Sequence, residues 1–79
     1  MDFYRDRIDD AVLALLQLTA FDDHGAVRAW KNHSWDALDR LHEKGMIANP
    51  RGKAKSVILT QEGAARSEDL FRRLFSKRG

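Results

Sequence analysis

Apolar side chains in the first part of the chain recur at the spacing of a helix. They predict a helix from Arg7 to about Ala20, with Asp6 at its N-cap. Further apolar side chains beside the stripe leave this helix apolar on nearly every side. A small domain either buries such a helix at the centre of its core or shares it with a partner. The pattern is typical of both arrangements. The stripe consists of Ile8, Val12, Leu15 and Leu16.

A second, shorter helix is predicted from Gly25 to about Lys31. Val27 and Trp30 lie three residues apart in it, which is the spacing of two neighbours on one helix face. Both side chains would then face the core. Asn32 and His33 follow as the turn into the next helix.

The third predicted helix runs from Trp35 to Lys44 and has signals at both ends. Ser34 is a preferred N-cap residue, and Gly45 stands where helices commonly end in left-handed backbone. One face of this helix is apolar and the other is mixed in charge. The inward stripe is Trp35, Leu38, Leu41 and His42, and the outward residues are Asp36, Asp39, Arg40, Glu43 and Lys44.

A β-hairpin is predicted from Met46 to Leu59. The residues Asn49-Pro50-Arg51-Gly52 follow the preferences of a type I turn. They join a short strand, Met46–Ala48, to a returning strand, Lys53–Leu59, that ends in β-branched residues. Arg51 therefore stands at the tip of the hairpin.

The fourth predicted helix runs from Gln61 to about Ser76, with Thr60 as its N-cap. Opposite charges four residues apart support it, in the pairs Glu68–Arg72 and Asp69–Arg73. Its apolar stripe is Ala64, Ser67, Phe71, Leu74 and Phe75, with Leu70 alongside. The predicted order in this α+β domain is thus helix, helix, helix, β-hairpin, helix.

Two stretches resemble the winged helix-turn-helix superfamily. Leu38-Asp39-Arg40-Leu41-His42-Glu43-Lys44-Gly45-Met46-Ile47 is similar to the end of the reading helix in bacterial regulators. Leu59-Thr60-Gln61-Glu62-Gly63 is similar to the start of the helix that follows their wing. Over nearly its whole length the chain also resembles a small bacterial family known as a domain of unknown function. That second resemblance rests on Ala29-Trp30-Lys31, on Trp35 to Gly45 and on Lys53-Ala54-Lys55-Ser56-Val57.

The superfamily resemblance implies one winged-helix-like domain over residues 1–79 that associates with double-stranded DNA. In such domains the third helix enters the major groove and the wing contacts phosphate. On this sequence the wing cations are Arg51, Lys53 and Lys55. Arg40 is then the candidate base reader on the third helix, and Lys31 lies near the groove.

A protein-interaction module on the same scaffold is the alternative function. The outward face of the third helix carries more acidic than basic side chains, and carboxylates are repelled by DNA phosphates. A homodimer through the first and last helices is expected. Trp30 and Trp35 are predicted to anchor the core, and the other interpretation is that bases of a single strand stack on them.

Composition narrows the function further. The 79 residues include no cysteine, which excludes disulfides and thiolate chemistry. His24, His33 and His42 lack the spacing of metal ligands. With no catalytic set and no glycine-rich phosphate loop, we expect a protein that is not an enzyme and holds no metal or cofactor. The sequence has no signal peptide and no membrane span, so a cytoplasmic protein is expected.

Charge is distributed unevenly along the chain. The sequence pI is about 9.3, although the net charge is only +2. Residues 1–49 hold six basic and nine acidic side chains, a net of −3, and residues 50–79 hold eight and three, a net of +5. Such a division is typical of a docking surface. In the basic part, the segment from Arg51 to Lys55 carries cations that lie outside any predicted ion pair or helix end.

Overall fold

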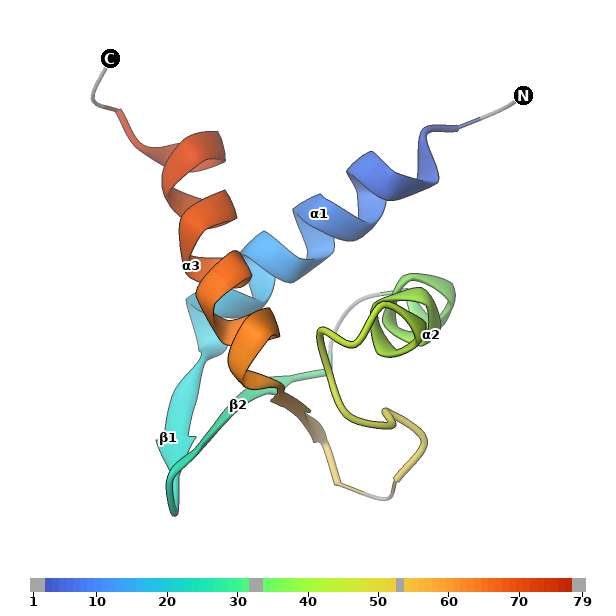
Figure 1. Cartoon of the computed structure of the whole chain (residues 1–79), viewed down its shortest axis with the longest axis vertical. Helices are drawn as coiled ribbons and strands as arrows, with labels where there is room; N and C mark the ends of the chain where they lie inside the picture. Colours follow the sequence, from blue (N-terminus) through green and yellow to red (C-terminus); the bar gives the residue numbers. More distant parts are fainter. Residues whose placement is uncertain (1–2, 32–33, 53, 78–79) are drawn as a thin grey trace.

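The computed structural model describes residues 3–31, 34–52 and 54–77. Asn32 and His33 of the predicted turn and the wing cation Lys53 lie outside the described residues. Helices and a three-stranded antiparallel sheet alternate along the chain, which confirms the α+β class (Figure 1). The elements are α1 (Arg5–Leu16), the 3-10 turn η1 (Gln17–Thr19), β1 (Phe21–Asp23), β2 (Ala26–Trp30), α2 (Trp35–Glu43), β3 (Ser56–Leu59) and α3 (Gln61–Phe75).

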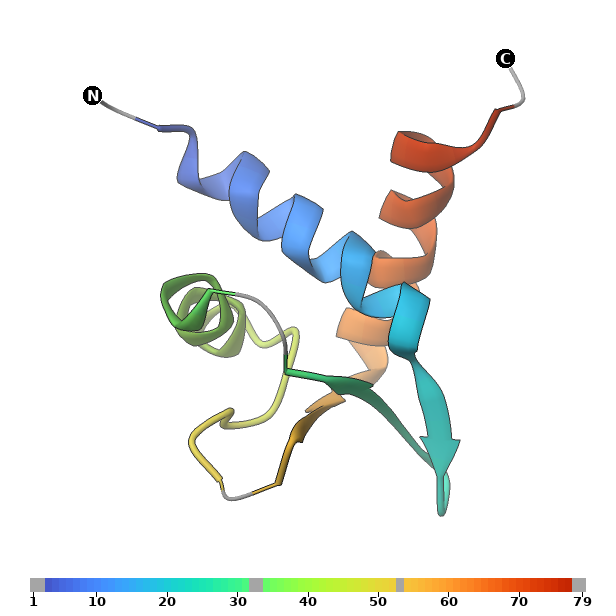
Figure 2. The same ribbon diagram turned by 180° about the vertical axis from the view of Figure 1, so that it is seen from behind.

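Helix α1 lies at the centre of the molecule, with α2 and α3 on either side of it (Figures 1 and 2). It begins at Arg5 with Tyr4 at the N-cap, so the prediction of Asp6 as the cap was wrong. Its buried side chains include Leu13 and Leu16, whereas Ile8 of the predicted stripe stays partly exposed. The buried stripe of α1 is therefore rotated about the helix axis relative to the predicted stripe. Close contact with α3 is made at the buried Ser67, whose hydroxyl donates to the Leu13 carbonyl at 2.7 Å.

The predicted short helix from Gly25 to Lys31 was wrong, because this segment forms a β-hairpin. β1 and β2 pair in antiparallel register, with Asp23 opposite Ala26. His24 and Gly25 between them have φ values of 51° and 86°, and a two-residue hairpin turn of this kind needs positive φ at both positions. The helix before α2 that a helix-turn-helix requires is thus replaced by a strand, and the winged-helix assignment is not confirmed.

The predicted hairpin from Met46 to Leu59 forms only in part. Its returning strand begins at Ser56, so the described Ala54 and Lys55 lie outside it. The strand pairs mainly with β2, where Ala29 lies opposite Val57. The first strand is reduced to one bridge between Ile47 and Leu59. An Asx contact from the Arg51 N–H to the Asn49 side chain, at 2.9 Å, shapes the turn.

The ends of α2 and α3 lie close to their predicted positions. Gly45 has φ +79° and closes α2, as expected from the preference of glycine for left-handed backbone. Ser34 occupies the N-cap of α2, although its side chain makes no capping hydrogen bond. Thr60 caps α3 by accepting a hydrogen bond from the Gly63 N–H at 2.9 Å, and its hydroxyl donates to the Gly45 carbonyl at 2.7 Å.

The core lies between the helices and one face of the sheet. Alternate residues of the strands, among them Ala29 and Val57, point into it. At the edge of this core α3 passes very close to the loop after α2. A Cβ added at Gly63 would lie 1.7 Å from the Met46 carbonyl oxygen, so only glycine fits there.

We expect Gly63→Ala to destabilise the fold by at least about 3 kcal/mol, because the new methyl group meets rigid backbone. At an unobstructed helix position the same change stabilises by about 1 kcal/mol, so the sign of the effect is diagnostic. Urea unfolding followed by circular dichroism measures it. Gly52→Ala is the control, since an added Cβ there has no atom within 4 Å. A Gly63→Ala protein as stable as wild type would contradict this packing.

Candidate nucleic-acid interface

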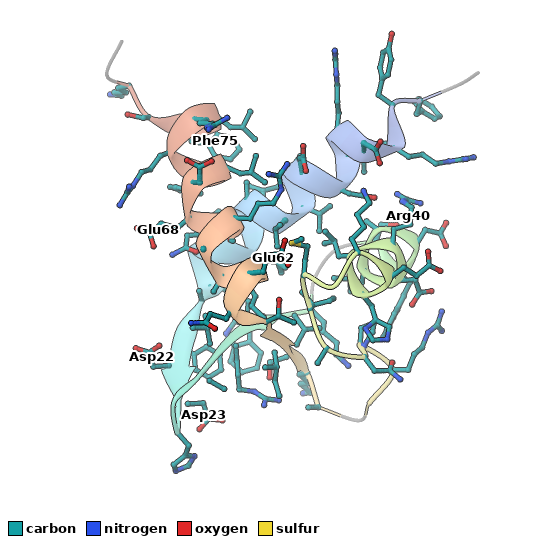
Figure 3. The ribbon with its side chains drawn as sticks, in the orientation of Figure 1. Asp22, Asp23, Arg40, Glu62, Glu68 and Phe75 are labelled. Atoms are coloured by element: carbon teal, nitrogen blue, oxygen red, sulfur yellow. The ribbon has the colours of Figure 1, made fainter. Side chains whose placement is uncertain are left out.

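Arg40, the predicted base reader, lies between α2 and α1 (Figure 3). Its Nε donates to both carboxylate oxygens of Asp9 at 2.9 Å, and its Nη2 lies 2.8 Å from Oδ1. The Asp9 side chain has no exposed surface. Lys44, one helical turn after Arg40, donates to the same carboxylate at 2.8 Å and to Asp6 at 2.9 Å. Both cations of the α2 surface are thus engaged in holding α2 against α1.

The balance of charges around Asp9 favours its ionised form. Burial alone would raise the pKa of the Asp9 carboxyl. The hydrogen bonds from Arg40 and Lys44, together with their positive charges, outweigh burial and bring this pKa below its ordinary value. The same contacts raise the pKa values of Arg40 and Lys44. All three groups are therefore charged at neutral pH.

The cations of the predicted wing have a different arrangement. Arg51 turns back towards α2, where its Nε donates to Asp39 at 3.2 Å and its Nη2 forms a second hydrogen bond to the same carboxylate. This hydrogen bonding and the charge of Asp39 raise the pKa of Arg51. The guanidinium carbon of Arg51 also lies 5.2 Å from the centre of the Trp35 ring.

Lys31 meets Arg51 at the same aromatic ring. Its Nζ lies 5.4 Å from the centre of the Trp35 ring and donates to the Gly52 carbonyl at 3.0 Å. Its backbone N–H donates to the Lys55 carbonyl at 2.9 Å, which brings the segment before β3 alongside. Lys31, Trp35 and Arg51 together form what we term the Trp35 cluster. Residues 31 and 35, four apart in the sequence, and Arg51 from the loop after α2 thus combine two cations with an aromatic ring.

The two tryptophans do not anchor the core as predicted. Trp30 and Trp35 each keep 48% of their surface exposed. Trp35 presents its ring within the Trp35 cluster, and Trp30 contacts Phe21, with their ring centres 5.5 Å apart. The alternative interpretation, in which bases of a single strand stack on these rings, stays a prediction.

The Trp35 cluster also has acidic neighbours, since the charges of Asp39 and Asp36 both act on Arg51. Asp22, Asp23 and Glu68 lie along β1 and α3, on the opposite side of the view from Arg40 (Figure 3). A cavity of about 290 Å³ between those elements is lined by Asp22 and Glu68, and Glu68 forms an ion pair with Arg72. In the part of the chain that the structure describes, no group of three or more acidic, histidine or cysteine side chains converges on a metal position.

Comparison with known proteins identifies the chain by family. The elements define a small α+β domain that carries an exposed aromatic and basic cluster. The family described as Domain of unknown function (DUF6429) matches residues 4–77. The chain belongs to that family, which confirms the predicted membership of a family of unknown function. It is 54% identical over 77 residues to an uncharacterised protein, y4hR, of the bacterium Sinorhizobium fredii, a match that covers 98% of this chain and 100% of the relative. No solved structure matches. Among the described residues, no helix is both long and apolar enough to cross a membrane.

We expect Asp9→Asn to destabilise the protein by about 3 kcal/mol, because it leaves two cations without their counter-charge. Asp10→Asn, which removes only an exposed contact to Arg66, is the matched control. Chemical unfolding at neutral pH compares the two. Equal stability of the two variants would contradict the role of Asp9.

The pH dependence provides a second readout of the same variant. Because the pKa of Asp9 is lowered on folding, its contribution is complete above its unfolded-state pKa of about 3.9 and disappears as pH falls through the lower folded value. The difference in unfolding free energy between wild type and Asp9→Asn should therefore shrink below about pH 4. Unfolding curves between about pH 2 and pH 7 test this.

Proposed function

We propose that this chain is a small nucleic-acid-associated module that contacts the phosphate backbone through the Trp35 cluster and Lys55. The observation that carries the proposal is the meeting of Lys31 and Arg51 at one exposed tryptophan ring. Cations beside an exposed aromatic ring are the combination that binds phosphate and base together. Lys55 adjoins through its backbone contact to Lys31.

Backbone contact accounts for these residues better than reading of a base sequence. Arg40 is held by the buried Asp9, and Asp36 and Glu43 remain exposed on α2, where they would repel phosphates. Asp39 balances the charge of Arg51, which leaves a modest positive excess around Trp35. Such a surface binds weakly, with little sequence preference and a strong dependence on salt. The function we propose is binding, without catalysis.

A protein interface is the second candidate, and a separate observation favours it. Leu74 and Phe75 at the end of α3 are exposed, as is Ile8 near the start of α1. These helix ends diverge towards the two termini (Figure 1). A homodimer through the first and last helices would cover these apolar side chains. Sedimentation at increasing protein concentration tests for it, and a strict monomer would contradict it.

Removing the cations at Trp35 should weaken nucleic-acid binding and its salt dependence. Every cation that no longer meets a phosphate should reduce the slope of log K against log salt by about 1. For Lys31→Gln with Arg51→Gln we therefore expect a slope smaller by about 2 than that of wild type. Fluorescence anisotropy with labelled duplex and single-stranded DNA, at about 50 and about 200 mM salt, measures it.

The matched control is Arg72→Gln with Arg73→Gln, which removes the same charge from the exposed side of α3. This control should bind like wild type. If wild type binds neither form of DNA at the lower salt concentration, or if both double variants are weakened equally, the proposal is wrong.

A further inference from the structure

An open groove lies between the β1–β2 hairpin and the first half of α3. It consists of two adjoining cavities of about 290 Å³ and about 400 Å³, and Val27 and Ala64 line both of them. The two side chains pack against the core but are only partly buried. Val27 lies on the core-facing side of β2, as the buried Ala29 does two residues later. The helices therefore leave part of the inner surface of the hairpin uncovered, and we term this opening the hairpin groove.

The edge of the hairpin groove is acidic. Asp22 on β1 and Glu68 on α3 line the smaller cavity together. Among the described residues, no side chain pairs with the Asp22 carboxylate. Glu68 forms an ion pair with Arg72 at 2.6 Å, but both side chains are more than half exposed, and such pairs contribute little to stability. Both carboxylates are therefore accessible to a cation that enters with a ligand.

The face of α3 that lines the groove continues past it towards the end of the helix. Successive members of this face are four, three and four residues apart, which is the spacing of neighbours along one side of a helix. The Phe71 and Phe75 rings lie 5.3 Å apart, and Phe75 keeps 47% of its surface exposed. Figure 3 shows Asp22, Glu68 and Phe75 in this order from the hairpin to the far end of α3. The face consists of Ala64, Glu68, Phe71 and Phe75.

The two ends of this face complement each other when two copies of α3 lie side by side in opposite directions. Phe75 of one copy then lies opposite Ala64 of the other, where the groove has room for a ring. Arg72 comes within reach of Glu68 in the same arrangement, because both pairs are centred near Leu70 in the sequence. In a two-fold symmetric dimer each of these contacts occurs twice. One face of α3 thus carries both the groove and the group that fits it.

We propose that this chain forms a two-fold symmetric dimer in which Phe75 of each copy enters the hairpin groove of the other and Arg72 pairs with Glu68 across the interface. Charge complementarity favours this occupant, since an acidic groove with apolar walls needs an apolar group with a cation beside it. A nucleic-acid strand would bring phosphates to two carboxylates, which repel them. The dimer does not rest on the nucleic-acid binding proposed above, because the Trp35 cluster takes no part in it. It also differs from a dimer through α1, because Ile8 is not in the interface.

Sedimentation between about 10 μM and about 1 mM protein should show an equilibrium of monomer and dimer. Phe75→Ser should weaken the dimer at least about tenfold, because a buried aromatic side chain carries a large share of the binding energy at an interface. Leu74→Ser is the matched control, since Leu74 is 52% exposed at the same helix end but lies on the adjacent face of α3. It should change the dissociation constant little. Circular dichroism of each variant checks that the fold is retained.

Charge reversal tests the contact between Glu68 and Arg72 independently of stability. Glu68→Arg and Arg72→Glu should each dimerise at least about tenfold more weakly than wild type, because like charges then meet across the interface. An equimolar mixture of the two variants should regain the dimer, because the charges of one copy then meet opposite charges on the other. The ion pair within each chain stays broken in the mixture, so a change in folding does not explain this recovery.

Three outcomes overturn the inference. A protein that is monomeric at every concentration forms no such dimer. A mixture of the charge-reversed variants that stays monomeric removes the contact between Glu68 and Arg72. A dimer that is weakened by Leu74→Ser and Ile8→Ser, but not by Phe75→Ser, assigns the interface to α1 and the adjacent face of α3. None of these results affects the nucleic-acid binding proposed above, which the salt dependence of the Lys31 and Arg51 variant tests separately.

Discussion

Asp9 is a carboxylate without exposed surface, and two cations from α2 make its burial possible. An ionised carboxylate removed from water needs a counter-charge and hydrogen bonds, and Arg40 and Lys44 provide both. Because Arg40 and Lys44 lie one helical turn apart, their hydrogen bonds to Asp9 together restrict sliding and rotation of α2 on α1. The position of α2 on α1, and with it that of Trp35 at the start of α2, depends on this contact.

The same contact determines which charges remain for a ligand. Arg40 and Lys44 would be the natural partners of phosphate on α2, but each is hydrogen-bonded to the fully buried Asp9. Arg51 also has a carboxylate partner, Asp39, but both side chains of that pair are partly exposed. The cations near the exposed rings come instead from the end of β2 and from the loop after α2. Lys31 and Arg51 reach the ring of Trp35 from these two segments. In the proposed function, α2 presents the Trp35 side chain to the ligand and does not read bases.

Local patterns predicted α2 and α3 well, because their end signals act within a few residues. Gly45 and Thr60 lie at the helix ends where the sequence pattern predicts them. Val27 and Trp30 led to the wrong prediction of a helix, because a spacing of three residues fits one helix face. That spacing alone does not show whether the segment can pair with a neighbouring strand. His24 and Gly25 have the positive φ values of a two-residue hairpin turn. In the sequence, a glycine that follows a polar residue was the signal that could have predicted this turn.

The site was harder to predict than the fold because its contacts join distant segments. Arg40 and Asp9 are 31 residues apart, and no local rule connects them. One signal was present: Asp9 shares a helix face with Leu13 and Leu16, which marks a carboxylate among buried residues. Nothing near Arg51 in the sequence points to Trp35. Lys31 was predicted from its charge and its place near the groove in the winged-helix resemblance, but its contact with the Trp35 ring was not predicted.

The most direct measurement follows side-chain N–H signals of labelled protein by NMR during titration with a single-stranded oligonucleotide. The Trp35 indole N–H signal and the Arg51 Nε–H signal should shift together. The Arg40 Nε–H signal, held by Asp9, should stay in place. Shifts centred on Arg40, or no shift at the Trp35 indole, would contradict this account.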